Sequence, residues 1–400
     1  MTTTTESATG AAPDTARRDP RTLLHYSRTA EATTMRMLAL VAVIVLVAVV
    51  FNVVTDGVFI SPRNLTNLSV QVSVTALVSI GVTWLLIARQ IDLSSGALIA
   101  LIAVLIAQSE VVHQWPFAAA VGIALGLGLV CGLVNGLLVA KWGIPAFIVT
   151  LGAFSYLRGA AYLVSDGNTV AGFGPTMFAL GNDGVPPLLS VLLVLLVTGA
   201  GVALTVRRLA AERARGGIRL STALSLVAIL FAGAVATWVF GSYQGVPWAV
   251  VIAGVAIAVA ILVSTQTPFG RHLYAVGGNP ASARRAGIDI TRLMIILFVV
   301  AGLLTAIGAL VQAARLDSGP PTTANLMELS AISAAVVGGT SLFGGKGTIG
   351  GSMLGAVLMA AIANGLSLAG VNTFWQLVAT GVLLVVAVAT DRRARKESAL

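Results

Sequence analysis

Reactive side chains are few in this chain and lie far apart. The three histidines stand in separate polar segments, and there is one cysteine: His25, His113, His272 and Cys131. Catalysis and metal binding each need several such groups at suitable spacing, and a disulfide needs two cysteines. The sequence therefore predicts no enzyme activity, no metal site and no cofactor, and Cys131 is expected to be a small packing residue.

One segment resembles part of a phosphate-binding loop. In the run from Gly344 to Thr348 a lysine follows two glycines, as in nucleotide-binding loops. However, Gly347 stands where the motif needs Ser or Thr, and Thr340 stands where it needs its first glycine. We therefore expect this chain to bind no nucleotide.

Arg158 is the one clear ionisable residue inside an apolar segment. A charge at the centre of a membrane helix costs roughly 2.5 to 3.5 kcal/mol on insertion scales. Two interpretations stay open: the guanidinium reaches the outer headgroups, or it faces the interior of the bundle and lines a pathway. Carboxylates are scarce in the apolar segments, which argues against ion coupling. The expected source of energy is therefore a partner protein.

Long apolar segments make up most of the chain. Hydrophobic residues are 57% of the composition, charged residues are 10%, and the mean hydropathy is +0.95. At these values most of the chain must lie in lipid. Because a helix crosses the hydrocarbon core with about 20 apolar residues, we expect an all-α, polytopic transmembrane helical bundle of about 12 spans, with a range of 10 to 12. The predicted spans are 37–54, 67–88, 93–112, 117–140, 145–165, 186–206, 220–240, 247–266, 291–313, 328–343, 349–368 and 373–390.

The tenth predicted span, 328–343, differs from the others. It is short and runs into a glycine-rich stretch. Irregular backbone at membrane depth is tolerated where neighbouring helices shield it. We therefore expect a broken or half-inserted helix. For Gly338, Gly339, Gly344 and Gly345 close helix packing is the preferred interpretation, and a hinge is the alternative.

The basic residues fall on one side of the predicted membrane. With the N-terminus inside, 21 of the 24 Lys and Arg residues lie in inner segments, and acidic residues such as Glu110 and Glu328 lie in outer ones. Such sorting marks the cytoplasmic side, so both termini are predicted to be cytoplasmic. The net charge of +9 is then a signal of topology rather than of nucleic-acid binding. The predicted organisation is a disordered cytoplasmic tail over 1–36, a transmembrane domain over 37–390 and a basic cytoplasmic tail over 391–400.

The inner loop over 268–290 carries turn and helix signals of its own. Asn279 is a good N-cap, Pro280 suits the first helical position, and Gly287 can end a helix. A helix of about two turns is therefore expected outside the membrane. It is either a plain amphipathic connector or a docking surface through which a soluble motor moves the spans.

Several separated motifs resemble one family of membrane proteins. The run from Tyr274 to Asn279, followed by Ala283-Arg284 and Gly287-Ile288, closely resembles the cytoplasmic coupling loop of permease subunits in binding-protein-dependent ABC importers for monosaccharides. Further segments are similar to that family in the same order: 90–96, 145–151, 157–159, 338–342 and 364–365. The resemblance covers about residues 55–390.

Within this family the chain looks most like the longer, xylose-type permeases, which carry an extra pair of spans, here within 186–240. The resemblance implies import of D-xylose or a related pentose or hexose across a bacterial inner membrane. It also implies a homodimer of permeases, a cytoplasmic ATP-binding subunit and an extracytoplasmic sugar-binding protein. The chain departs from the family pattern at Arg285-Ala286 in the coupling loop and at Ser330, where relatives have an acidic residue.

The predicted functional residues form two further groups beside the hinge. The resemblance implies contacts with the ATP-binding subunit at Gly277, Gly278, Asn279, Ala283, Arg284 and Gly287. The expected sugar pathway consists of polar side chains in apolar spans, namely Asn135, Thr150, Arg158 and Asn364. Bonding between helices is the alternative for this group, and the preferred one for Asn135 and Thr150. Asp92 is expected to be the N-cap of the third span.

An ion-coupled secondary sugar transporter is the main alternative function. A bundle of about 12 spans with both ends inside fits that class equally well. The coupling-loop motif favours the ABC importer. Such a permease would be inert without its ATP-binding subunit, whereas a secondary carrier would work alone.

Overall fold

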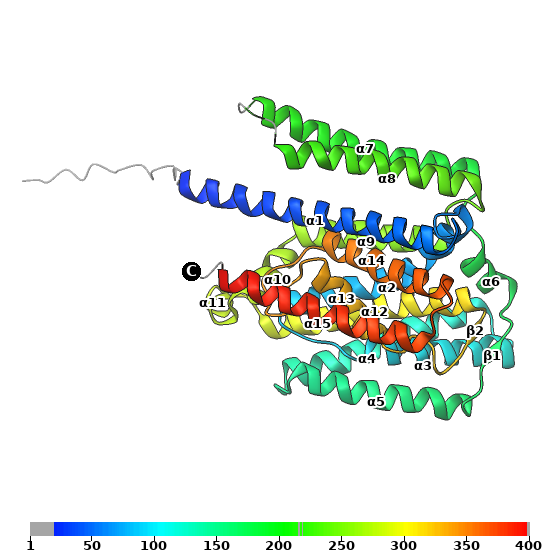
Figure 1. Cartoon of the computed structure of the whole chain (residues 1–400). Coiled ribbons are helices and arrows are strands. Elements are labelled where there is room, and N and C mark those ends of the chain that lie inside the picture. The colour runs from blue at the N-terminus through cyan, green and yellow to red at the C-terminus, as the bar shows by residue number, and fades with distance from the viewer. Residues whose placement is uncertain (1–19, 215–216, 218, 398–400) are drawn as a thin grey trace, which may run out of the picture.

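Helices make up nearly all of the structure, a computed structural model that describes residues 20–214, 217 and 219–397 (Figure 1). The all-α bundle predicted from composition is confirmed. The elements in chain order are α1 (Pro20–Val54), α2 (Pro62–Ile87), α3 (Ser95–Ala107), the π-helix η1 (Gln108–Val112), α4 (Phe117–Ala140), α5 (Ala146–Ser165), β1 (Val170–Ala171), α6 (Pro175–Asn182), α7 (Pro187–Ala214), α8 (Leu220–Ser242), α9 (Trp248–Gln266), α10 (Pro268–Gly278), α11 (Pro280–Arg285), α12 (Ile290–Leu316), β2 (Ser318–Gly319), α13 (Met327–Val337), α14 (Ile349–Leu368) and α15 (Thr373–Glu397).

Ten helices of the described part are long and apolar enough to cross a membrane. Large apolar side chains are exposed along several of them, including α1, α5, α7 and α8, as expected for surfaces that face lipid. These ten include neither α13 nor α15, so the exact number of crossings stays a prediction.

The tenth predicted span is indeed short. Helix α13 has 11 residues, a length of about 16 Å and thus about half of a crossing. It ends at Gly338, where the glycine-rich stretch begins. Before α13, the segment 317–326 folds back into the bundle. Its close approach to α3 shows this: a Cβ at Gly96 would lie 2.7 Å from the carbonyl oxygen of Ala324.

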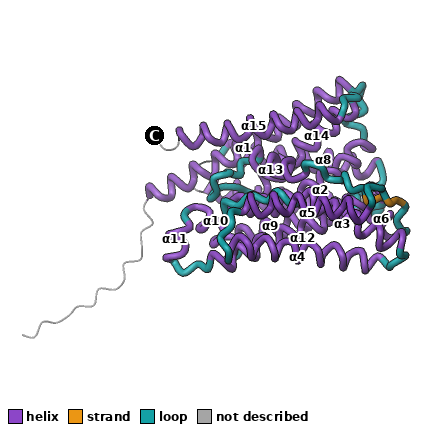
Figure 2. Tube along the Cα trace, turned by 90° about the horizontal axis from the view of Figure 1, so that it is seen from below, coloured by secondary structure: helices purple, strands orange, loops and turns teal. Residues whose placement is uncertain are grey.

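The described ends of the chain lie together. The start of α1 and the end of α15 are at the same end of the bundle as α11, whereas α6 and the antiparallel pair β1–β2 are at the opposite end (Figures 1 and 2). We call these the α11 end and the β end. The arrangement agrees with termini on one side of the membrane; that this side is the cytoplasm stays a prediction.

The interior is built around α12, which packs against α4 and α2. Glycines permit close contacts there: a Cβ at Gly132 would lie 2.5 Å from the carbonyl oxygen of Phe298. Small residues of this kind let membrane helices approach each other closely. By contrast, α7 and α8 pack mainly on each other and reach the rest through contacts of α8 with α1 and α2, so this hairpin stands at one edge of the bundle (Figure 1).

Two boundaries differ from the sequence predictions. Helix α1 begins at Pro20 rather than at Met37, so part of the segment expected to be a disordered tail is helical. Helix α15 likewise continues to Glu397 through the predicted basic tail. An established helix adds residues at little cost, which explains both extensions. Residues 1–19 and 398–400 lie outside the described part.

Candidate functional site

The short helix predicted in the loop 268–290 is present as α11. The Asn279 side chain caps it by accepting a hydrogen bond from the Ser282 amide at 3.1 Å. Gly287 follows its end with a left-handed φ of 82°. Ala283 is buried against the apolar cluster that contains residues of α12, whereas Arg284 and Arg285 are exposed. The helix is thus anchored on one face and presents basic side chains at the α11 end.

The segment before α11 is tied to the end of α2. Arg89 has a left-handed φ of 64°, and its guanidinium reaches the last residues of α10. Its Nε donates to the Gly277 carbonyl at 2.7 Å, and a terminal nitrogen donates to the Gly278 carbonyl at 2.6 Å. A cation at a helix C-terminus is favourable, because free carbonyls gather there.

The glycine-rich stretch meets the same point. The Gly345 amide donates to the carbonyl of Ile87 at 2.9 Å. A Cβ at Gly277 would collide with that carbonyl oxygen and would lie 2.8 Å from the Gly345 nitrogen. Three segments distant in sequence therefore touch backbone to backbone. We call this contact the glycine junction; it comprises Ile87, Arg89, Gly277, Gly278, Gly344 and Gly345.

Side chains beside the junction hold the glycine-rich stretch in place. The Tyr274 hydroxyl donates to the Gly347 carbonyl at 2.8 Å, and burial raises the pKa of Tyr274, so the phenol stays a neutral donor. On α14, Ser352 accepts from Thr83 of α2 at 2.8 Å and lies 3.2 Å from the Thr340 hydroxyl. The structure thus unites the predicted coupling residues Gly277 and Gly278 with the predicted hinge.

The four predicted hinge glycines differ in their surroundings. A Cβ at Gly338 would collide with Gly351, and a Cβ at Gly344 would collide with the Arg89 side chain. A Cβ at Gly345 would lie 3.0 Å from the Gly278 Cα, whereas one at Gly339 would meet no atom within 4 Å. Three of the four glycines therefore serve close packing, and movement at these positions stays a prediction.

A second set of polar residues lies around the start of α3. The expectation that Asp92 caps this helix is wrong: Ser94 occupies the N-cap position. Asp92 instead accepts from the Ser94 amide at 2.8 Å and from the Ser94 hydroxyl at 2.6 Å, because it lies two residues too early to reach the helix. The predicted residues Asn135 and Thr150 meet this loop, donating to the Ser94 hydroxyl at 3.3 Å and to the Ile91 carbonyl at 3.2 Å.

Arg158 faces the interior rather than the headgroups. Its Nη1 donates to the carbonyls of Pro321 and Thr323, at 2.8 and 3.0 Å, in the segment that folds back before α13. Glu328, at the start of α13, attracts it electrostatically. The Glu328 side chain is only 4% exposed and lies against Gly96 of α3, and its placement on the outer side of the membrane stays a prediction. Glu110, within the predicted span 93–112, is also buried.

Asn364 lies apart from these residues. Its amide pairs with that of Asn64 through two reciprocal hydrogen bonds of 3.0 and 3.1 Å, and Asn64 also donates to the Phe59 carbonyl. Both side chains are buried. The pair ties α14 to α2, and this favours bonding between helices for Asn364.

Comparison with known proteins assigns the family. A family profile described as branched-chain amino acid transport system / permease component matches residues 64–388. The chain belongs to this family. The xylose transport system permease protein XylH of Escherichia coli K12 is 34% identical to this permease over 369 residues, 91% of this chain and 93% of the relative. XylH of Haemophilus influenzae is 35% identical over 367 residues, and the ribose import permease protein RbsC of E. coli K12 is 32% identical over 360 residues.

The H. influenzae XylH match covers 90% of this permease and 96% of the relative; for RbsC the shares are 90% and 94%. No solved structure matches the chain. The family is one of transport permeases rather than enzymes. With its many membrane-crossing helices, this permease is a multi-pass protein of a bacterial inner membrane.

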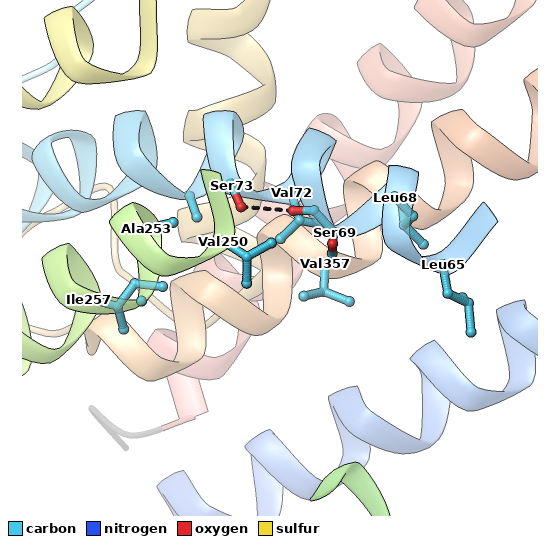
Figure 3. Close-up of a pocket in the computed structure, with 11 residues that line it drawn as sticks. Leu65, Leu68, Ser69, Val72, Ser73, Val250, Ala253, Ile257 and Val357 are labelled. Atoms are coloured by element: carbon cyan, nitrogen blue, oxygen red, sulfur yellow. Dashed lines mark hydrogen bonds between the residues drawn. The ribbon is translucent and has the colours of Figure 1, made fainter. Parts of the chain in front are cut away.

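The permease also has an apolar groove of about 300 Å³ between α2, α9 and α14 (Figure 3). Its two serines are already bonded within α2: Ser69 donates to the Thr66 carbonyl and Ser73 to the Ser69 carbonyl. The other lining side chains are apolar, among them Leu65, Val250 and Ile257. The groove therefore offers a hydrophilic substrate little beyond the acceptor lone pairs of these two serines.

Proposed function

We propose that this permease is the membrane subunit of a binding-protein-dependent ABC importer that carries a monosaccharide into the cell. We further propose D-xylose, or a related pentose or hexose, as the substrate. The names of the xylose and ribose permeases similar to it support the substrate class. The observation that carries the mechanism is the glycine junction, which joins the end of α10, directly before the predicted docking helix, to α2 and to the connection between α13 and α14.

The proposed partners lie at opposite ends of the bundle. A cytoplasmic ATP-binding subunit would dock on α11, where the exposed Arg284 and Arg285 offer positive charge to its surface. An extracytoplasmic sugar-binding protein would dock at the β end, on the loops 55–66, 166–185 and 314–327. A second copy of the permease would complete a homodimer within the lipid bilayer.

Closure of the ATP-binding subunits would move α11 and α10 together. The end of α10, which leads into the docking helix α11, is held tightly against α2: Gly277 and Gly278 touch the backbone of Ile87 and Gly345, and their carbonyls accept hydrogen bonds from the Arg89 guanidinium. Interfaces of this kind pass a rigid-body shift onward rather than absorbing it. The shift would change the populations of two states of the bundle, each open to one side.

The proposed sugar pathway passes the loop between α2 and α3. Asn135, Thr150 and Arg158 project toward this loop or toward the segment that folds back before α13. A neutral sugar needs a small number of weak hydrogen bonds along such a path. Asn364, bonded to Asn64, lies away from it.

One observation favours the alternative, an ion-coupled secondary sugar transporter. Asp92 and Glu328 are buried, although the sequence shows few carboxylates in its apolar spans. Buried carboxylates within a membrane bundle often serve proton or cation pathways. The two functions differ in their energy source, so one assay separates them.

The test is uptake of radiolabelled xylose into liposomes that hold the permease, with its ATP-binding subunit, its sugar-binding protein and ATP added in all combinations. The importer predicts uptake that needs all of these components. It also predicts loss of uptake in Arg284→Glu but not in the matched variant Arg208→Glu, whose arginine is exposed at the end of α7. Uptake by the permease alone, driven by a pH or sodium gradient, would establish the secondary transporter instead.

A further inference from the structure

We propose that Arg158, Glu328, Ser95 and Asn135 form a binding site for the hydroxyl groups of a neutral polyhydroxy compound inside the bundle. The inference rests on the proposed function, since it names the residues that would receive the transported sugar. It differs from the pathway described above because Glu328 and Ser95 become direct contacts.

The four side chains each keep one polar atom free. These atoms are Nη2 of Arg158, Oε2 of Glu328, Oγ of Ser95 and Oδ1 of Asn135; each is buried and makes no well-formed hydrogen bond within the described residues, and the Glu328 carboxylate lies beside the Gly96 amide. Glu328, Ser95 and Asn135 are exposed by only 4%, 1% and 3%. Native proteins leave few buried polar atoms unpaired, so four in one region need an explanation.

Contacts along the chain bring these atoms into one region. Gly96, the neighbour of Ser95, lies against the Glu328 carboxylate. Asn135 donates its amide to Ser94, so its free oxygen lies beside the same helix start. Arg158 approaches from α5, where Nη1 holds the Thr323 carbonyl while Nη2 stays free.

The chemistry of the free atoms selects the class of ligand. A hydroxyl group can donate one hydrogen bond and accept others. The guanidinium offers a donor, the carboxylate and the amide offer acceptors, and the serine hydroxyl can do either. Together these groups suit neighbouring hydroxyls of a sugar.

Charged ligands fit the same groups less well. A metal cation would be repelled by the Arg158 guanidinium, and an anion would be repelled by Glu328 and by the nearby Asp92, which interacts electrostatically with Glu328. The opposite charges of Arg158 and Glu328 compensate each other, so a neutral ligand adds no uncompensated charge to the interior.

The segment that folds back before α13 covers the site. Arg158 holds it through the Pro321 and Thr323 carbonyls, and Gly96 lies directly under Ala324. The segment thus lies between the site and the β end, in contact with α3 and α5. A sugar can enter only if this segment moves away from both helices, and the short helix α13 that follows the segment can move with it.

The experiment uses the complete transporter in liposomes, with xylose as the probe. The variants are Glu328→Gln, which keeps the shape of the side chain, and Ser95→Ala. The matched control is Glu110→Gln. Glu110 is also a buried carboxylate with a free Oε2, but it lies in η1, which follows α3 at the end opposite to Ser95. The readouts are xylose turnover, ATP hydrolysis stimulated by the loaded binding protein, and the melting temperature of the purified permease.

The site predicts that Glu328→Gln lowers xylose turnover about tenfold, while Glu110→Gln stays within about twofold of the wild type. Stimulated ATP hydrolysis and melting temperature should stay near the wild-type values in both, which a purely structural role for Glu328 would not allow. Equal turnover in Glu328→Gln, Ser95→Ala and Glu110→Gln would overturn the site but leave the importer intact. A wild-type transporter that hydrolyses ATP yet takes up no monosaccharide would instead overturn the proposed function.

Discussion

The glycine junction and the α7–α8 hairpin are attached to the bundle in opposite ways. At the junction, backbone atoms of α2, α10 and the glycine-rich stretch touch directly, and added side-chain atoms would collide. In the hairpin, large apolar side chains of α7 face outward, and a Cβ at Gly199 would meet no atom within 4 Å. Tight backbone contact can transmit displacement, whereas a peripheral hairpin can change without disturbing the rest.

The largest effect is expected from a side chain inserted into the junction. In Gly277→Val the new atoms collide with the Ile87 carbonyl and push away the Gly345 amide. Overpacking of this kind costs roughly 1 to 3 kcal/mol, and separation of α10 from α2 should abolish xylose uptake. Uptake and thermal melting measure the two effects.

The control for this variant is Gly199→Ala in the hairpin. Alanine is the better helix former by about 1 kcal/mol and meets open space there, so stability should hold or rise. Loss of uptake in Gly199→Ala equal to that in Gly277→Val would remove the distinction between the two regions.

A smaller effect is expected from Gly344→Ala. This variant compares a glycine that touches Arg89 with Gly339, a glycine of the same stretch that has open space around it. Gly344 has a φ of 80°, and its new methyl group would displace the Arg89 side chain. Gly339→Ala is the matched control, because Gly339 has a φ of 92° and open space around its Cβ position. Both variants carry backbone strain of about 1 to 3 kcal/mol, so any additional loss of uptake in Gly344→Ala reports the contact with Arg89. Equal uptake in the two variants would show that this contact is unimportant.

Tyr274→Phe removes one hydrogen bond beside the junction and should lower the free energy of unfolding by about 1 kcal/mol. The bond to Gly347 stabilises the glycine-rich stretch without being part of the backbone contact. Since burial raises the pKa of Tyr274, the wild-type phenol keeps its proton, and its contribution should not change between pH 6 and about pH 9. Denaturant unfolding at several pH values measures this; a wild-type contribution lost below pH 9 would contradict the assignment.

The smallest effect is expected in the hairpin connection. Glu212 is half-buried and accepts from the Arg219 amide at 3.1 Å and from the Thr222 hydroxyl at 3.0 Å. Glu212→Gln keeps the shape of the side chain and its acceptor oxygen, so it should change stability by no more than about 0.5 kcal/mol. Xylose uptake should be unchanged, and a clear fall would show that the hairpin takes part in coupling.

The sequence predicted local features better than distant contacts. Apolar runs located most helices, and the Asn279 cap and Gly287 located α11, because these signals act within a few residues. The shortness of α13 was visible from the glycines that follow it. Each of these features depends on neighbours in the chain rather than on tertiary packing.

Contacts between distant segments left no such signal. Arg89 is one basic loop residue among many, and its bonds to Gly277 and Gly278 arise only in the folded bundle. The polar loop before Glu328 suggests an exposed carboxylate, but this loop folds back into the bundle and the Glu328 side chain is buried. The Asn64–Asn364 pair joins residues 300 positions apart. Hydropathy and spacing describe single elements, so they could not reveal these contacts.

The most direct test of the account is the number of xylose molecules taken up per ATP hydrolysed, because the central claim is that the glycine junction couples the two. Arg89→Ala removes both guanidinium bonds to α10 but leaves the docking helix α11 untouched. The account predicts that the ratio falls about tenfold while ATP hydrolysis continues, with the matched variant Arg208→Ala near the wild-type ratio. An unchanged ratio in Arg89→Ala would contradict it.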